Sequence, residues 1–102
     1  MEGIKLDQGK PRMDLLPMDS LVEVARVLSF GANKYAPRNW ELGMDWGRLQ
    51  GALLRHLAAW DQGQNLDPET GLPHLAHMAC NALMLLALAQ RGVGKDTRFK
   101  PD

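Results

Sequence analysis

Apolar residues recur at helical spacing in three segments of the chain, and no segment shows the alternation of a half-buried strand. Leucine, valine and alanine repeat every three or four residues over 19–35, 46–62 and 72–91. This spacing places them along one side of each helix. The sequence therefore predicts an all-α fold, a small bundle of three main helices.

Capping and turn residues mark the ends of these segments. Ser20 followed by Glu23 has the spacing of a capping box for the first helix, and Asp45 is placed to cap the second. Pro73 suits the first turn of the third helix, and Gly92 suits its C-terminal end. We therefore expect three separate helices joined by structured connections.

The rest of the chain divides into an arm and a tail around one domain. A chain of 102 residues is one domain, and we place it at 18–92, with a C-terminal tail at 93–102. Residues 1–17 form an arm, in which prolines and glycines prevent regular structure. Leu15 and Leu16 predict that this arm packs on the domain.

The third helix is apolar around most of its circumference. It has no formal charge between Leu72 and Gln90. A helix of this kind must be buried on several sides, and two other helices of similar length cannot cover it. We therefore predict a homo-oligomer, a dimer or larger, with this helix at or near the interface.

The composition argues against nucleic-acid and membrane partners. Twelve basic and twelve acidic residues give zero net charge, so nothing indicates a stable nucleic-acid complex. The longest uninterrupted apolar run, 82–89, is far shorter than the ~20 residues of a membrane span. No signal peptide is recognisable, and the single cysteine, Cys80, suits a reducing compartment. We expect a cytoplasmic protein without membrane contact.

The third helix also carries candidate metal ligands. His74, His77 and Asn81 follow one another at spacings of three and four, so they lie on one face. Two histidines at this spacing can bind one metal ion, and Asp67 and Glu69 come just before them. Alternatively, the histidines are hydrogen-bonded interface residues, while the acids stabilise a turn and a helix N-terminus.

Candidate substrate-binding residues lie elsewhere on the chain. Arg48 and Arg55 are seven residues apart on one helical face, where they can hold phosphate oxygens or pair with acids across an interface. His56, next to Arg55, has a structural role as readily as a functional one.

The connection after the first helix combines aromatic, amide and cationic side chains. Tyr35 and Trp40 flank it, close to Lys34 and Asn39. This combination can stack on a purine, contact its edge and attract its phosphates. Alternatively, Trp40 anchors the connection to the core.

Several motifs together resemble a known family. They are GKPRMDLLP at 9–17, FGANKYA at 30–36 followed by Asn39-Trp40, Arg55-His56-Leu57, and DPETGLPHLAH at 67–77. The chain resembles, over roughly residues 9–92, the small phage and prophage dATP/dGTP diphosphohydrolases, relatives of the all-α MazG-like nucleoside triphosphate pyrophosphohydrolases. The resemblance implies an oligomeric helical bundle, a magnesium-type ion, and release of pyrophosphate from a (deoxy)nucleoside triphosphate, which would shape a phage nucleotide pool.

One departure from the wider MazG-like pattern concerns the metal. That pattern has Glu-x-x-Glu on one helix and Glu-x-x-Asp on the next, whereas the only acids on the helices here are Asp19, Glu23 and Asp61. Where a second acidic motif might stand, the chain has His74-x-x-His77. Imidazole ligands suit Mn, Co or Zn better than Mg.

These observations lead to one hypothesis and two alternatives. The hypothesis is metal-dependent hydrolysis of dATP or dGTP to monophosphate and pyrophosphate, with Mg, Mn, Co or Zn as the ion. The predicted metal ligands are His74, His77, Asp67 and Glu69; the predicted catalytic residues are Glu69, His56 and Asp67; the predicted substrate-binding residues are Lys34, Tyr35, Asn39, Trp40, Arg48, Arg55 and Asn81. The first alternative is a non-catalytic helical oligomer that binds a nucleotide or a host protein. The second, a helix-turn-helix DNA binder, is disfavoured because the third helix has no Lys or Arg before Arg91.

Overall fold

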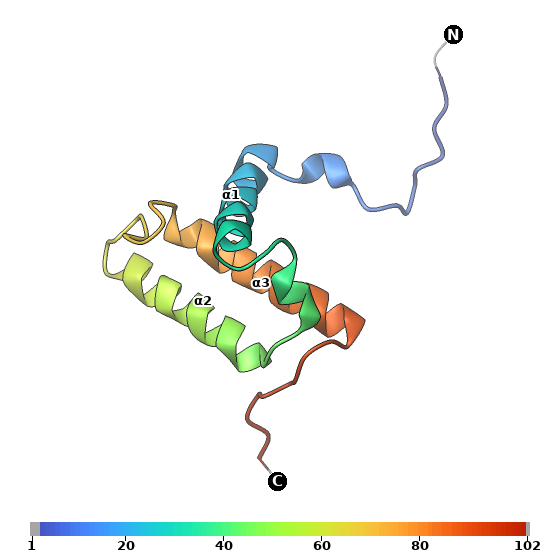
Figure 1. Cartoon of the computed structure of the whole chain (residues 1–102). Coiled ribbons are helices and arrows are strands. Elements are labelled where there is room, and N and C mark those ends of the chain that lie inside the picture. The colour runs from blue at the N-terminus through green and yellow to red at the C-terminus, as the bar shows by residue number, and fades with distance from the viewer. Residues whose placement is uncertain (1–2, 102) are drawn as a thin grey trace.

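Three α-helices form the body of the computed structural model, which describes residues 3–101 (Figure 1). The elements are η1 (Met13–Leu15), α1 (Met18–Lys34), η2 (Asn39–Leu42), α2 (Trp46–Asp61) and α3 (His74–Arg91), where η marks a short 3-10 helix. The described residues contain no strand, so the predicted all-α class is confirmed. No helix among them has the length and apolarity needed to cross a bilayer.

Helix α3 is the centre of the fold. Helices α2 and α3 lie side by side in opposite directions, and α1 crosses α3 (Figure 1). Both α1 and α2 pack on α3, but they make little contact with each other. The buried apolar residues in the described chain are Val24 on α1, Leu49 on α2, and Ala76, Cys80 and Leu88 on α3. The core therefore follows one side of α3.

The predicted helix ends are partly correct. Gly92 ends α3 in the left-handed conformation expected of a C-terminal glycine, with φ +64°. The prediction that Ser20 and Glu23 form a capping box was wrong, because α1 begins at Met18 and Ser20 already lies inside the helix. Asp45 does stand at the start of α2, but its side chain makes no capping hydrogen bond.

The segment that follows α3 returns to the start of α2. The Trp46 backbone amide donates to the Lys95 carbonyl oxygen (2.9 Å), and its indole Nε1 donates to the Val93 carbonyl oxygen (2.9 Å). The Thr97 hydroxyl accepts a hydrogen bond from the Gly47 amide (2.8 Å). The predicted tail therefore supplies the cap that Asp45 does not provide.

The close approach in this segment requires a glycine. Gly94 has φ +85°, and a Cβ at this position would meet the Met44 carbonyl oxygen and the Trp46 indole. A larger residue would therefore push the segment away from the start of α2.

The N-terminal arm does not pack on the domain, and this part of the prediction was wrong. Every residue from 3 to 20 is exposed, with Ile4 at 89% and Leu15 at 70%. The arm runs away from the helices before α1 (Figure 1). The radius of gyration is 16.9 Å, against about 13 Å for a compact chain of this length. Met1 and Glu2 lie outside the described residues.

The central position of α3 predicts where truncation destabilises the protein. Leu88 is 0% exposed, so Leu88→Ala leaves a cavity and should lower the free energy of unfolding by about 2–5 kcal/mol. Leu42 is 82% exposed, and Leu42→Ala should change it by less than about 0.5 kcal/mol. Urea denaturation followed by circular dichroism measures both changes. Equal losses in the two variants would contradict this account of the core.

Candidate functional site

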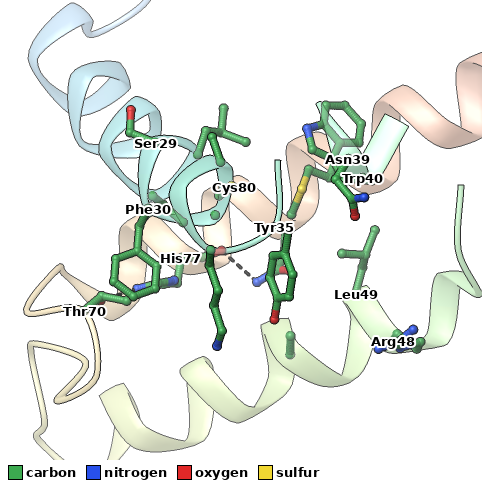
Figure 2. Close-up of a pocket in the computed structure, with 18 of the residues that line it drawn as sticks. Ser29, Phe30, Tyr35, Asn39, Trp40, Arg48, Leu49, Thr70, His77 and Cys80 are labelled. Carbon is green, nitrogen blue, oxygen red and sulfur yellow. Dashed lines mark hydrogen bonds between the residues drawn. The ribbon is translucent and has the colours of Figure 1, made fainter. Parts of the chain in front are cut away.

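A cleft of about 980 Å³ opens between α1 and α2, with α3 as its floor (Figure 2). It exists because α1 and α2 both pack on α3 but hardly on each other. Its α2 wall includes Arg48, Leu49, Ala52, Arg55 and His56, which recur at helical spacing, while α3 contributes His77, Cys80, Asn81 and Met84. The volume lies at the upper end of the ~300–1,000 Å³ typical of small-molecule sites.

The two ends of the cleft differ in their side chains. Tyr35 extends from the end of α1 into the space above α2, with Phe30 and Thr70 towards one end and Asn39 and Trp40 towards the other (Figure 2). The first end carries imidazoles, a carboxylate and a hydroxyl. The second carries the Trp40 indole and the Asn39 amide.

The three histidines of the chain meet at the first end. The rings of His56 and His77 stack face to face, with centroids 4.3 Å apart and planes inclined by 7°. Nδ1 of His56 lies 2.8 Å from Nδ1 of His74, and Nε2 of His74 lies 2.7 Å from Oε1 of Gln64. The antiparallel packing of α2 and α3 causes this meeting, because the end of one helix lies beside the start of the other.

The loop between α2 and α3 supplies the carboxylate. Asp67 Oδ2 lies 3.4 Å from His77 Nε2, and the Thr70 hydroxyl lies 2.7 Å from the same nitrogen. The other oxygen of Asp67 accepts a hydrogen bond from the Glu69 amide (2.9 Å), and the Gly71 amide donates to the Asp67 carbonyl oxygen (2.7 Å). These bonds fix the Asp67 side chain beside His77.

Within residues 3–101, His56, Asp67 and His77 form the candidate metal-binding group, since each offers one ligand atom and these atoms lie within 4.8 Å of one another. Two imidazoles and a carboxylate suit Zn, Mn or Co, whereas Mg prefers an oxygen cage. The stacked rings lie in nearly parallel planes, so their lone pairs do not converge. One ring must turn before both can reach a single ion.

Two residues predicted as metal ligands lie outside this group. Both ring nitrogens of His74 are already hydrogen-bonded, to His56 and to Gln64. Glu69 is largely exposed and forms an ion pair with Lys34 (3.0 Å) at the edge of the cleft. The structure thus brings His56 to Asp67 and His77, in place of His74 and Glu69.

Four cationic side chains line the cleft, namely Lys34, Arg38, Arg48 and Arg55. Lys34 pairs with Glu69 and Arg38 with Glu41. Within residues 3–101, Arg48 and Arg55 take part in no ion pair. Their positive charge is available to an anion on the wall that also carries His56.

The predicted base-binding residues all line the cleft, with different surroundings. Tyr35 and Asn39 are exposed. Trp40 is half-buried, and the Arg91 guanidinium lies 5.9 Å from its ring centre, so Trp40 also anchors η2 to the end of α3. The Asn81 amide donates to the His77 carbonyl oxygen (2.9 Å).

Sequence reasoning missed two residues at the histidine end, Gln64 and Thr70. Each hydrogen-bonds a histidine that the fold buries. The available signal was indirect, because a buried imidazole needs polar partners and the loop beside these histidines carries both side chains.

Burial sets the protonation of this cluster. Removal from water lowers the pKa of His56, and the charge of His77 lowers it further, while Asp67 acts in the opposite direction. Burial also lowers the pKa of His77, again against the effect of Asp67. Both rings are therefore neutral at neutral pH, and each has one unprotonated nitrogen. Burial raises the pKa of the Cys80 thiol to about 11, so it remains an unreactive thiol on the cleft floor.

The lowered pKa values of His56 and His77 predict how stability depends on pH. As the pH falls below about 6.5, the unfolded chain takes up these protons first, so the free energy of unfolding should decrease. It should therefore fall between about pH 7 and about pH 5.5, as measured by urea denaturation at each pH. His56→Gln should flatten this dependence. A stability that is constant across the range would contradict the assignment.

The sequence of the chain is similar to that of known proteins. A relative from Salmonella phage PMBT28, named dATP/dGTP diphosphohydrolase, is 39% identical over 98 residues, which cover 96% of this chain and 33% of the relative. The chain thus spans about a third of that protein's length. No solved structure matches the chain. The family model described as "dATP/dGTP diphosphohydrolase, N-terminal" matches residues 2–98, and the chain belongs to this family.

Proposed function

We propose that the chain hydrolyses the purine deoxynucleoside triphosphates dATP and dGTP, with a divalent metal ion, to monophosphate and pyrophosphate. One observation carries the proposal: Arg48 and Arg55, free of ion pairs within the described residues, share a cleft wall with His56. The names of the family and of the phage relative support this substrate class.

The arginines would bind the phosphates. Seven residues along a helix correspond to about 10 Å, so Arg48 and Arg55 can contact different phosphate groups of one extended ligand. Guanidinium groups bind phosphate oxygens through paired hydrogen bonds. Lys34 lies on the opposite side, from α1, and Glu69 holds it at the edge of the cleft.

The reacting group would be the cluster of His56, Asp67 and His77. These residues would hold the ion, which supplies charge neutralisation and an acidified water when bound. The two neutral imidazoles offer lone pairs, and Asp67, fixed through its backbone and Oδ1, can accept a proton near His77. The base would lie at the other end, beside Tyr35, Asn39 and Trp40.

The hydrolysis assay tests this proposal directly. Pure protein is incubated with each dNTP and with Mg, Mn, Co or Zn, and the products are resolved by ion-exchange chromatography. We expect monophosphate and pyrophosphate from dATP and dGTP, and no turnover after chelation of the metal. Absence of turnover with every ion would overturn the enzymatic proposal.

Replacing one arginine should weaken substrate binding. Arg55→Gln should raise KM for the purine dNTP about tenfold or more, because a hydrogen bond to a charged group contributes about 1.5–3 kcal/mol. Arg26→Gln is the matched control, since Arg26 is exposed on α1 and does not line the cleft. Steady-state kinetics of both variants give the comparison. An equal KM in the two variants would rule out this role for Arg55.

A second candidate is a module that binds the nucleotide without cleaving it. The stacking of His56 on His77 favours it, because the lone pairs do not converge in this arrangement. Nucleotide binding measured by calorimetry, together with no turnover in the assay above, would distinguish this function from hydrolysis.

We also propose that the protein is a homo-oligomer. Leu75, Leu83 and Leu86 of α3 are 50%, 46% and 54% exposed, and their spacing places them on one face. An apolar face of this kind is covered when a second copy packs on it. Leu83→Glu should therefore convert the assembly to a monomer in sedimentation velocity, whereas Leu42→Glu should not. A monomeric wild-type chain at micromolar concentration would overturn the proposal.

A further inference from the structure

A chain of hydrogen bonds runs from the exposed loop into the cleft through two histidines. Gln64 follows the end of α2, His74 begins α3, and His56 lies in the last half of α2. Oε1 of Gln64 contacts Nε2 of His74 at 2.7 Å, and Nδ1 of His74 contacts Nδ1 of His56 at 2.8 Å. His74 is only 4% exposed, and each of its two ring nitrogens has one of these side chains as its hydrogen-bond partner.

The Gln64 carboxamide oxygen determines which atom donates in each of these hydrogen bonds. A carboxamide oxygen only accepts hydrogen bonds, so Nε2 of His74 carries the proton. A neutral imidazole has one N–H, so Nδ1 of His74 accepts. Nδ1 of His56 must then donate, which leaves Nε2 of His56 as a bare lone pair.

The remaining nitrogen of His56 is accessible from the cleft. No hydrogen bond to its Nε2 occurs within residues 3–101, whereas Nδ1 bonds His74. Every buried side-chain nitrogen or oxygen in that part of the chain has a hydrogen-bond partner. Nε2 is therefore not fully buried, and the ring lines the cleft.

We propose that Gln64 and His74 are positioning residues, which together hold His56 as its Nδ1-protonated tautomer and present a bare Nε2 to the cleft. In this form Nε2 can bind a divalent ion of the Zn, Mn or Co class. A histidine that ligates a metal donates its other N–H to a polar partner in this way. That Nε2 binds a metal ion rests on the proposed function. The tautomer of His56 does not, and it is measured without metal or substrate.

Imidazole nitrogen NMR tests the tautomer. The chain has only three histidines, so a sample labelled with ¹⁵N-histidine gives separable long-range correlations, and His56→Gln assigns the His56 signals. We expect a protonated Nδ1 and a bare Nε2 for His56 at neutral pH. A His56 protonated at Nε2 would overturn the proposal, since this is the result if the Gln64 amide instead donates to His74.

Two variants separate positioning from general destabilisation. Gln64→Met keeps the length of the side chain and removes the acceptor, so His56 should become a mixture of both tautomers. Gln62→Met is the matched control, because Gln62 is an exposed glutamine two residues away with no side-chain hydrogen bond in the described chain. Circular dichroism confirms that both variants fold. An unchanged His56 spectrum in Gln64→Met would overturn the proposal.

Binding of cobalt(II) alone provides the second measurement. Gln64→Met should weaken cobalt affinity about 10–100-fold, the usual effect of removing a residue that orients a ligating histidine, and Gln62→Met should leave it unchanged. Equal affinity in the two variants, or no cobalt binding by the wild-type chain, would overturn the metal-binding part. If the tautomer and cobalt results hold while no dNTP is hydrolysed, the proposed function fails and the positioning role stands.

Discussion

The burial of polar side chains on the central helix is the constraint on which the rest of the structure depends. His74, His77 and Asn81 are all buried on α3, and a polar group buried without a hydrogen bond costs about twice what a typical bond contributes. The partners come from the loop after α2 and from α2 itself, through Gln64 and His56. The loop between α2 and α3 is therefore held in one arrangement, and that arrangement assembles one end of the cleft.

The three helices could be predicted from the apolar periodicity of the sequence, but the face that α3 buries could not, because its leucines Leu75, Leu83 and Leu86 are half exposed while His74, His77 and Asn81 are buried. The ends of the helices were harder. The cap of α2 comes from Thr97, fifty residues further along the chain than Gly47, and local spacing gives no information about such a contact. The arm was misjudged because leucines such as Leu15 indicate burial only when a surface is available to receive them, and in a single chain Leu15 remains exposed.

The candidate site could be predicted as a set of residues but not as an arrangement. Spacing along α3 correctly placed His74 and His77 close together, yet it could not show that the two would face different partners. That difference arises because α2 lies antiparallel to α3, which brings His56 between them: its ring stacks on His77 while its Nδ1 contacts His74. Helical periodicity describes one element at a time, whereas this site is a property of two elements and a loop.

The position of α1 has a mechanical consequence for the cleft. One wall, α2, is joined firmly to the floor, whereas the other wall, α1, lies against α3 alone. At the histidine end, the Lys34–Glu69 ion pair links the two sides, and an exposed pair of this kind contributes little to stability because water and salt screen it. The α1 side of the cleft is therefore the less firmly attached side, and the ion pair that joins it to the histidine end uses the same lysine that an anionic ligand would attract.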